Sequence, residues 1–192
     1  MLYRIIKGII KPFIKLAYNV RVEGVENLPA EGPLIICANH YSAIDPVILA
    51  VSLPYRIYSM AKAELFNNRF FGWFLRSVGV FPVKRGEADI KSIKTALKLL
   101  KEGKIMGMFP EGTRNKTSEI KAEPGVAMIA IRSQAKVLPI AIISSYQFFK
   151  PTVVRIGESV TLEQYYDQKL QSDDYQNISM DIMKYINKLI KG

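Results

Sequence analysis

The sequence predicts a single-domain α/β sandwich in which a mostly buried mixed sheet is flanked by helices. Short apolar runs alternate along the chain with longer segments of helical periodicity, which is the pattern typical of this fold class. The chain has 192 residues, of which 49% are hydrophobic and 23% are charged. It is therefore long enough to bury one core and too apolar to be intrinsically disordered.

The first 20 residues predict an amphipathic helix, and residues 21–192 form the predicted main domain. Four basic side chains, spaced by three or four positions, form one stripe of this helix: Arg4, Lys7, Lys11 and Lys15. Their charge interrupts the apolar core that an export signal requires, and the stretch cannot span a bilayer. The helix either lies in a membrane interface, with its lysines toward anionic headgroups, or packs on the protein's own core.

After this helix, seven apolar runs predict strands, at Arg21–Val25, Leu34–Ala38, Arg56–Ala61, Val78–Val83, Ile105–Phe109, Val137–Ile142 and Val153–Ile156. Segments of helical periodicity lie at Pro46–Ser52, Leu65–Ser77, Asp89–Lys101, Gly125–Ser133 and Tyr175–Ile190. The stretch "ELFNNRFFGWFLRSVGVF" contains six aromatic rings. Apolar residues at helical spacing usually pack in a core, so we expect most of these rings to be buried, with one or two exceptions that line a substrate tunnel or lie at a membrane boundary.

The net charge of +10 favours anionic partners. No basic helix or recognised motif indicates nucleic acid, so an anionic membrane surface or a phosphorylated small molecule fits better. The one cysteine, Cys37, cannot form an intramolecular disulfide, which suits a reducing compartment. One cysteine and one histidine cannot fill a zinc site, and no metal is expected.

Two polar segments follow predicted strands. "ANHYSAIDP" follows the apolar run "PLIICA" and contains His40, the only histidine. "FPEGTR" follows the apolar run "IMGMF". Ligands of α/β proteins bind where strands end and helices begin, so these segments are candidates for one shared cleft.

His40 and Asp45 together predict a general base. A carboxylate bonded to one imidazole nitrogen fixes the tautomer and raises the basicity of the other nitrogen. No "GxSxG" elbow supplies an enzyme nucleophile, so the pair is suited to activating the hydroxyl of a substrate. On spacing alone this signal is weak, since a histidine that caps a helix has the same pattern.

Taken together, the segments resemble the glycerolipid acyltransferases, specifically the bacterial 1-acyl-sn-glycerol-3-phosphate acyltransferases. Four blocks stand in the family's order: "NHYSAID" with His40 and Asp45, "GVFPVKRG" with Arg85, "FPEGTR" from Phe109 to Arg114, and "VLPIAI" around Pro139. The resemblance runs from about Val22 to Gly157. The second block commonly reads "FIDR" in the family, and here it keeps the arginine but not the acidic residue.

The resemblance implies transfer of a fatty acyl group from acyl-carrier protein or acyl-CoA to the sn-2 hydroxyl of lysophosphatidic acid, giving phosphatidic acid. It implies that His40 and Asp45 are catalytic, with no metal or cofactor, and that the protein is peripheral or monotopic on the cytoplasmic face of the cell membrane. The implied substrate-binding residues are Arg85, Glu111, Gly112, Thr113 and Arg114. Two alternatives stay open: a related acyltransferase with another acceptor, such as glycerol-3-phosphate or another lysophospholipid, and a catalytically inactive basic protein that binds membranes.

Overall fold

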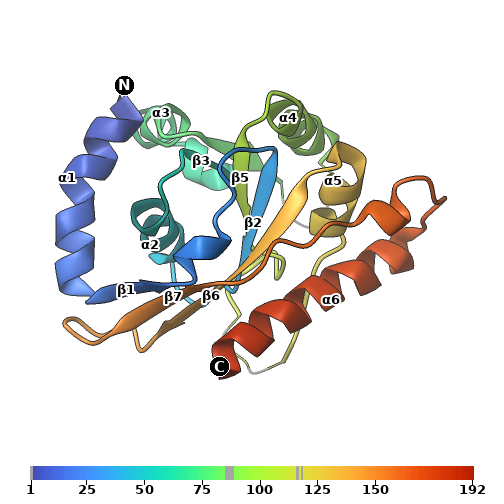
Figure 1. Ribbon diagram of the computed structural model, residues 1–192. Coiled ribbons are helices and arrows are strands. Elements are labelled where there is room, and N and C mark those ends of the chain that lie inside the picture. Colours follow the sequence, from blue (N-terminus) through green and yellow to red (C-terminus); the bar gives the residue numbers. More distant parts are fainter. Residues whose placement is uncertain (1, 85–88, 116, 118) are drawn as a thin grey trace.

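The structure is a computed structural model that describes residues 2–84, 89–115, 117 and 119–192. Within these residues, seven strands form one sheet in the order β1-β7-β6-β2-β5-β3-β4 (Figure 1). Neighbouring strands are parallel except for β6 and β7, which are antiparallel, so the predicted mixed sheet is confirmed. The strands are β1 Val20–Glu23, β2 Leu34–Ala38, β3 Ile57–Lys62, β4 Val80–Val83, β5 Ile105–Met108, β6 Lys136–Ser144 and β7 Thr152–Ile156.

Each predicted helix is present in the described part of the chain. The helices are α1 Leu2–Ala17, α2 Asp45–Ser52, α3 Arg69–Ser77, α4 Ile90–Lys101, α5 Gly125–Ser133 and α6 Ser172–Lys191. Helix α3 begins four residues later than predicted, because a 3-10 turn, Ala63–Phe66, precedes it and the Asn68 side chain accepts a hydrogen bond from the Phe71 N–H. An asparagine at this position satisfies a backbone donor that the helix leaves unpaired.

Helices cover both faces of the sheet, and the alternation along β2 shows the two layers. Ile35 and Cys37 point into a core formed with α4, α5 and α6. Leu34, Ile36 and Ala38 point into a second core, formed with α2 and with Ile14 of α1. All five residues of β2 are buried, as expected for a central strand of a sheet whose two faces are both covered by helices.

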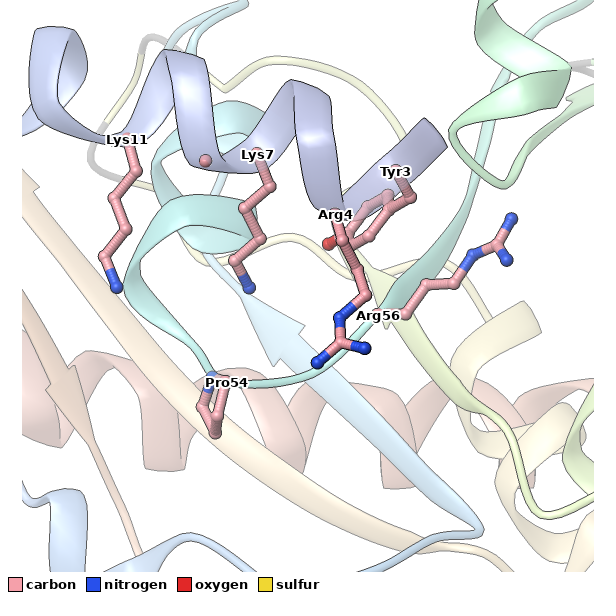
Figure 2. Close-up of a pocket in the computed structure, with 7 residues that line it drawn as sticks. Tyr3, Arg4, Lys7, Lys11, Pro54 and Arg56 are labelled. Carbon is pink, nitrogen blue, oxygen red and sulfur yellow. The ribbon is translucent and has the colours of Figure 1, made fainter. Parts of the chain in front are cut away.

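Helix α1 is fixed to the end of α2 by polar contacts of its first two turns. The Tyr3 hydroxyl donates to the Tyr55 carbonyl at 3.2 Å, and the Lys7 ammonium donates to the carbonyls of Leu53 and Tyr55. Lys7 therefore points into the protein, and burial, followed by the nearby charge of Lys11, lowers its pKa. Figure 2 shows Lys7 beside Arg4 and Lys11, directed toward the turn at Pro54.

An apolar row on the other side of α1 remains exposed. It consists of Leu2, Ile5, Ile9, Phe13 and Leu16. Among the described residues, no helix is both long enough and apolar enough to cross a membrane. One side of this helix thus packs on the domain, and another side is apolar and open. Its place in a membrane interface stays a prediction. The division into residues 1–20 and 21–192 stays a prediction.

The expectation that most of the aromatic cluster is core was wrong. Phe70, Phe71 and Trp73 are exposed, and the remaining three rings are only half-buried. The reason is the edge position of β4, because α3 packs there against one strand and a 3-10 turn. That small contact surface covers one side of a short helix and leaves its outer rings in solvent.

Candidate active site

The loop that leaves β2 is fixed to the neighbouring strand β6 by Asn39. Its side-chain amide donates to the Ile142 carbonyl at 2.9 Å and accepts from the Ile142 N–H at 2.7 Å. Asn39 is buried, so this pair of bonds replaces the ladder bonds that end with β2. The next residue is His40, which therefore leaves the sheet at a fixed point.

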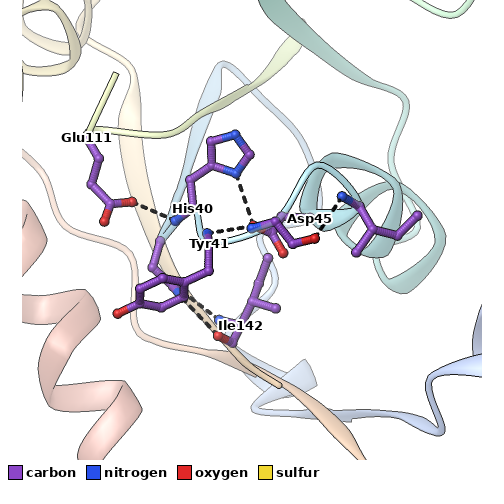
Figure 3. A network of polar contacts seen from close by, with 8 residues as sticks. His40, Tyr41, Asp45, Glu111 and Ile142 are labelled. Carbon is purple, nitrogen blue, oxygen red and sulfur yellow. Dashed lines mark hydrogen bonds and ion pairs between the residues drawn. The ribbon is translucent and has the colours of Figure 1, made fainter. Parts of the chain in front are cut away.

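His40 and Asp45 are bonded to each other across the turn that opens α2. The imidazole Nδ1 lies 3.0 Å from Asp45 Oδ2, which also accepts from the N–H groups of Tyr41 at 2.8 Å and Ser42 at 2.7 Å (Figure 3). Asp45 is fully buried in the first turn of α2, where the helix dipole favours a negative charge. The His40 side chain is 11% exposed. Among the described residues no hydrogen bond is made to its Nε2, so that nitrogen is available to a substrate.

The segment after β5 packs directly on this pair. The Phe109 ring stacks on the His40 imidazole, with ring centroids 4.1 Å apart and planes 22° apart. Glu111 Oε2 accepts from the His40 N–H at 2.6 Å, and the Asn115 N–H donates to the His40 carbonyl at 2.8 Å. The two polar segments thus lie side by side at the carboxyl ends of their strands, because β2 and β5 are parallel neighbours. The shared cleft stays a prediction.

Glu111 has one carboxylate oxygen engaged by the backbone of His40. Burial raises the pKa of Glu111, and the hydrogen bond from the His40 N–H opposes that change. The family resemblance implied that the Glu111 side chain binds substrate. The geometry gives Glu111 a further role, since it holds the His40 backbone against the loop after β5. Nothing in the sequence pairs Glu111 with His40, because their contact depends on the order of the strands.

The remaining predicted site residues lie around this pair or outside the described residues. Gly112 has φ +68°, and a Cβ there would lie 2.7 Å from Glu123 Cγ, so only glycine fits without displacement. Thr113 and Arg114 are exposed, beside the residues that contact His40. Arg85 lies outside the described residues.

Cys37 and one cavity beside α1 lie apart from this site. Cys37 is fully buried in the core, and burial raises the pKa of its thiol. A cavity of about 400 Å³ lies between α1 and the turn at Pro54 (Figure 2). That turn follows the C-terminal end of α2, whereas Asp45 begins the helix, so the cavity is at the other end of α2 from His40.

Comparison with known proteins identifies the family. Residues 19–143 match the acyltransferase family. The 1-acyl-sn-glycerol-3-phosphate acyltransferase of Bacillus subtilis is 40% identical over 141 residues, which cover 73% of this chain and 70% of that protein. The enzyme of the same name from Streptococcus pneumoniae is 31% identical over 144 residues, covering 73% and 53%. Human 1-acyl-sn-glycerol-3-phosphate acyltransferase alpha is 33% identical over 142 residues, covering 71% and 50%.

Among solved structures, the fold resembles that of the 1-acyl-sn-glycerophosphate (LPA) acyltransferase PlsC from Thermotoga maritima. The TM-score is 0.68 with 24% sequence identity, over 97% of this chain and 80% of that one. The chain spans 70% of the Bacillus relative and about half the length of the Streptococcus and human relatives. The family match covers well over half of the chain, and it includes both segments that meet at His40. The chain therefore belongs to the acyltransferase family.

Proposed function

We propose that the chain transfers a fatty acyl group from a thioester to the sn-2 hydroxyl of 1-acyl-sn-glycerol-3-phosphate, giving phosphatidic acid. The observation that carries this proposal is the 3.0 Å bond between His40 Nδ1 and Asp45 Oδ2, which leaves Nε2 open at a partly exposed position. The relatives named above act, by their names, on 1-acyl-sn-glycerol-3-phosphate. That substrate carries a free hydroxyl, which is a weak nucleophile at neutral pH without a base.

In the proposed reaction, His40 Nε2 takes the proton of the acceptor hydroxyl while its oxygen attacks the thioester carbonyl carbon. The C–O bond forms and a tetrahedral intermediate carries the negative charge on the former carbonyl oxygen. The intermediate then collapses, the C–S bond breaks, and the departing sulfur takes the proton back from the imidazolium. Asp45 stabilises the imidazolium between the two transfers, and the stacked Phe109 ring keeps the imidazole plane fixed.

The acceptor phosphate is proposed to bind to arginine. Arg114 is exposed beside the residues that contact His40, and a guanidinium binds phosphate through two parallel hydrogen bonds. Arg85 is proposed for the same ligand from its position in the sequence. Gly112 and Thr113 would let the backbone approach the acceptor. The proposed acyl donor is acyl-carrier protein or acyl-CoA.

We further propose that the protein is a peripheral protein of the cytoplasmic face of the cell membrane and that α1 lies at the interface. The support is the exposed apolar row of α1 together with the net charge of +10. At about 100° per residue, this row and the basic stripe lie about 160° apart around the helix, with the packed side between them. The apolar row, rather than the basic stripe, is therefore the side proposed to enter the bilayer.

Replacement of His40 by alanine tests the reaction. The assay is release of free thiol from acyl-CoA and from acyl-carrier protein, with and without lysophosphatidic acid. We expect the acceptor-dependent rate to fall by about 10²–10⁴, the usual effect of losing a general base. A folded His40→Ala protein with near wild-type turnover would refute the proposal. A panel of acceptors, including glycerol-3-phosphate and other lysophospholipids, separates this reaction from those of related acyltransferases.

A further inference from the structure

Two buried polar atoms near His40, beyond the carboxyl ends of β2 and β6, have no hydrogen-bond partner among the described residues. They are Asp45 Oδ1 and the hydroxyl oxygen of Tyr146. The other oxygen of Asp45, Oδ2, accepts from His40, Tyr41 and Ser42, so the carboxylate is engaged on one side only. A buried carboxylate oxygen is costly without a donor, and a tyrosine hydroxyl can donate.

Asp45 and Tyr146 both follow the carboxyl ends of adjacent strands. β6 pairs with β2, and Tyr146 follows the end of β6 just as the loop of His40 follows the end of β2. Burial is the largest cause that raises the pKa of Tyr146, and the charge of Asp45 is the next, so the hydroxyl lies near that carboxylate. Tyr41 and Glu111 contribute smaller effects in the same direction, so the hydroxyl faces an acidic edge and stays protonated.

The backbone holds Tyr146 in a conformation that a bulky residue rarely adopts. Its φ is +57°, in the left-handed region, which is unfavourable for an aromatic side chain. The Tyr146 N–H donates to the Ser144 hydroxyl at 3.0 Å, and that hydroxyl is 2.7 Å from the hydroxyl of Thr152 on β7. The ring packs against the core on the α2 side of the sheet. The ends of β6 and β7 thus determine where the ring lies.

We infer that Tyr146 is a positioning residue for the His40–Asp45 pair, and that its hydroxyl donates to Asp45 Oδ1. With both carboxylate oxygens engaged, Asp45 cannot rotate, and Oδ2 remains directed at the imidazole. The inference rests on the proposed function only for its effect on catalysis. The contact itself can be measured in the protein without substrate.

The test uses the fact that His40 is the only histidine. Its imidazole protons give one set of signals in a proton NMR titration, with no other histidine to overlap. Tyr146→Phe removes the donor and leaves more negative charge on Asp45 for the imidazolium. We expect the titration midpoint of the His40 signals to move to higher pH by about 0.5 unit or more. The acid limb of the activity profile should move in the same direction, and kcat should fall more than the acceptor KM changes.

Two controls separate the hydroxyl contact from general damage. Tyr55→Phe also removes a tyrosine hydroxyl, one that donates to the Pro29 carbonyl beyond the far end of α2, and it should leave the midpoint unchanged. In an Asp45→Asn background, Tyr146→Phe should add no further shift. If Tyr146→Phe does not fold, 3-fluorotyrosine at position 146 keeps the ring and strengthens the donor, and the midpoint should move to lower pH.

A midpoint that stays within about 0.1 unit of the wild-type value, in folded Tyr146→Phe and fluorotyrosine proteins, overturns the inference. A fall in kcat without a change in the midpoint also overturns it, because it would show a packing role for the ring. Neither result bears on the proposed reaction, which the thiol-release assay of His40→Ala decides separately.

Discussion

The loop from Asn39 to Asp45 and helix α1 differ most in how their side chains are held. In the loop, Asn39, His40 and Asp45 are buried, and each makes hydrogen bonds to another element or across the turn. In the described part of α1, Tyr3 is the only buried residue, and an apolar row faces solvent. Buried polar groups need specific partners, whereas an amphipathic helix needs only a surface.

This difference shows where function requires a fixed geometry. A general base works only if its nitrogen is within hydrogen-bond reach of the proton that it takes. The loop is accordingly held by strand β6, by the segment after β5 and by the first turn of α2. A membrane contact depends on apolar area and needs no fixed rotamers. Changes in the loop should therefore alter both stability and rate, and changes on the exposed side of α1 should alter neither in solution.

The largest effect on the folded chain is expected for Asp45→Ala. This change removes the acceptor of three hydrogen bonds and leaves the N–H groups of Tyr41 and Ser42 without a partner. We expect the free energy of unfolding to fall by roughly 3–5 kcal/mol, along with loss of activity. Chemical denaturation measures it, and Phe13→Ala on α1, where the ring is 68% exposed, should change stability by only about 0.5 kcal/mol or less. Equal losses for both variants would remove the contrast between the two regions.

A smaller effect is expected for Glu111, and it should depend on pH. Glu111→Ala leaves the His40 N–H without its acceptor and should cost roughly 1–3 kcal/mol of stability. Glu111→Gln keeps an acceptor oxygen and removes the charge. Burial raises the pKa of Glu111 above its ordinary value of 4.5, so the folded protein binds its proton more tightly than the unfolded chain.

The sign of the pH effect follows from this proton binding. The contribution of Glu111 to stability is most favourable below pH 4.5 and declines as the pH rises through the raised pKa of the folded state. Glu111→Gln lacks this decline, so its stability relative to the wild type should improve from pH 4 toward pH 7. Denaturation curves at both pH values measure the difference. A relative stability that is constant or worsens with pH would mean that Glu111 is not held in a buried, charge-disfavouring site.

Much of the fold could be predicted from the sequence because its signals are local. The run Leu34–Ala38 is strand β2 and the pattern Gly125–Ser133 is helix α5, both with the predicted bounds. The aromatic cluster on α3 was predicted less well, since periodicity identifies a helix but not how much surface its neighbours offer. Burial of Phe70 and Trp73 depends on the edge position of β4, which follows from the order of strands.

In the candidate site, too, contacts between residues close in the sequence could be predicted, and contacts that depend on strand order could not. His40 and Asp45 are five residues apart in one turn, and their pairing could be predicted once "FPEGTR" completed the family pattern. The contacts of Asn39, Phe109 and Glu111 depend on β2 lying between β5 and β6, and no pattern in the chain gives that order. Tyr146 carried no sequence signal, because a single tyrosine after a strand is common and its φ of +57° is visible only in the structure.

The smallest effect on the folded chain is expected on α1, and it concerns membranes. Ile9 and Phe13 are 60% and 68% exposed in the apolar row, so Ile9→Glu with Phe13→Glu should leave melting and activity on a detergent-dispersed acceptor nearly unchanged. If this row enters the bilayer, the double change removes apolar burial of roughly 3–6 kcal/mol and should release the protein from vesicles. Activity on vesicle-borne lysophosphatidic acid should fall with it.

The basic stripe gives the matched comparison for that last experiment. Changing Arg4, Lys11 and Lys15 to Gln, while keeping Lys7 because it donates to carbonyls of the protein, removes at most about 1 kcal/mol of attraction per charge. Its effect should disappear at high salt, since exposed charges are screened, whereas that of the apolar pair should persist. Co-sedimentation with anionic and neutral vesicles at two salt concentrations measures both. If the basic triple variant dissociates and the apolar double variant stays bound, then α1 meets the membrane through its lysines, and the apolar row covers some other surface.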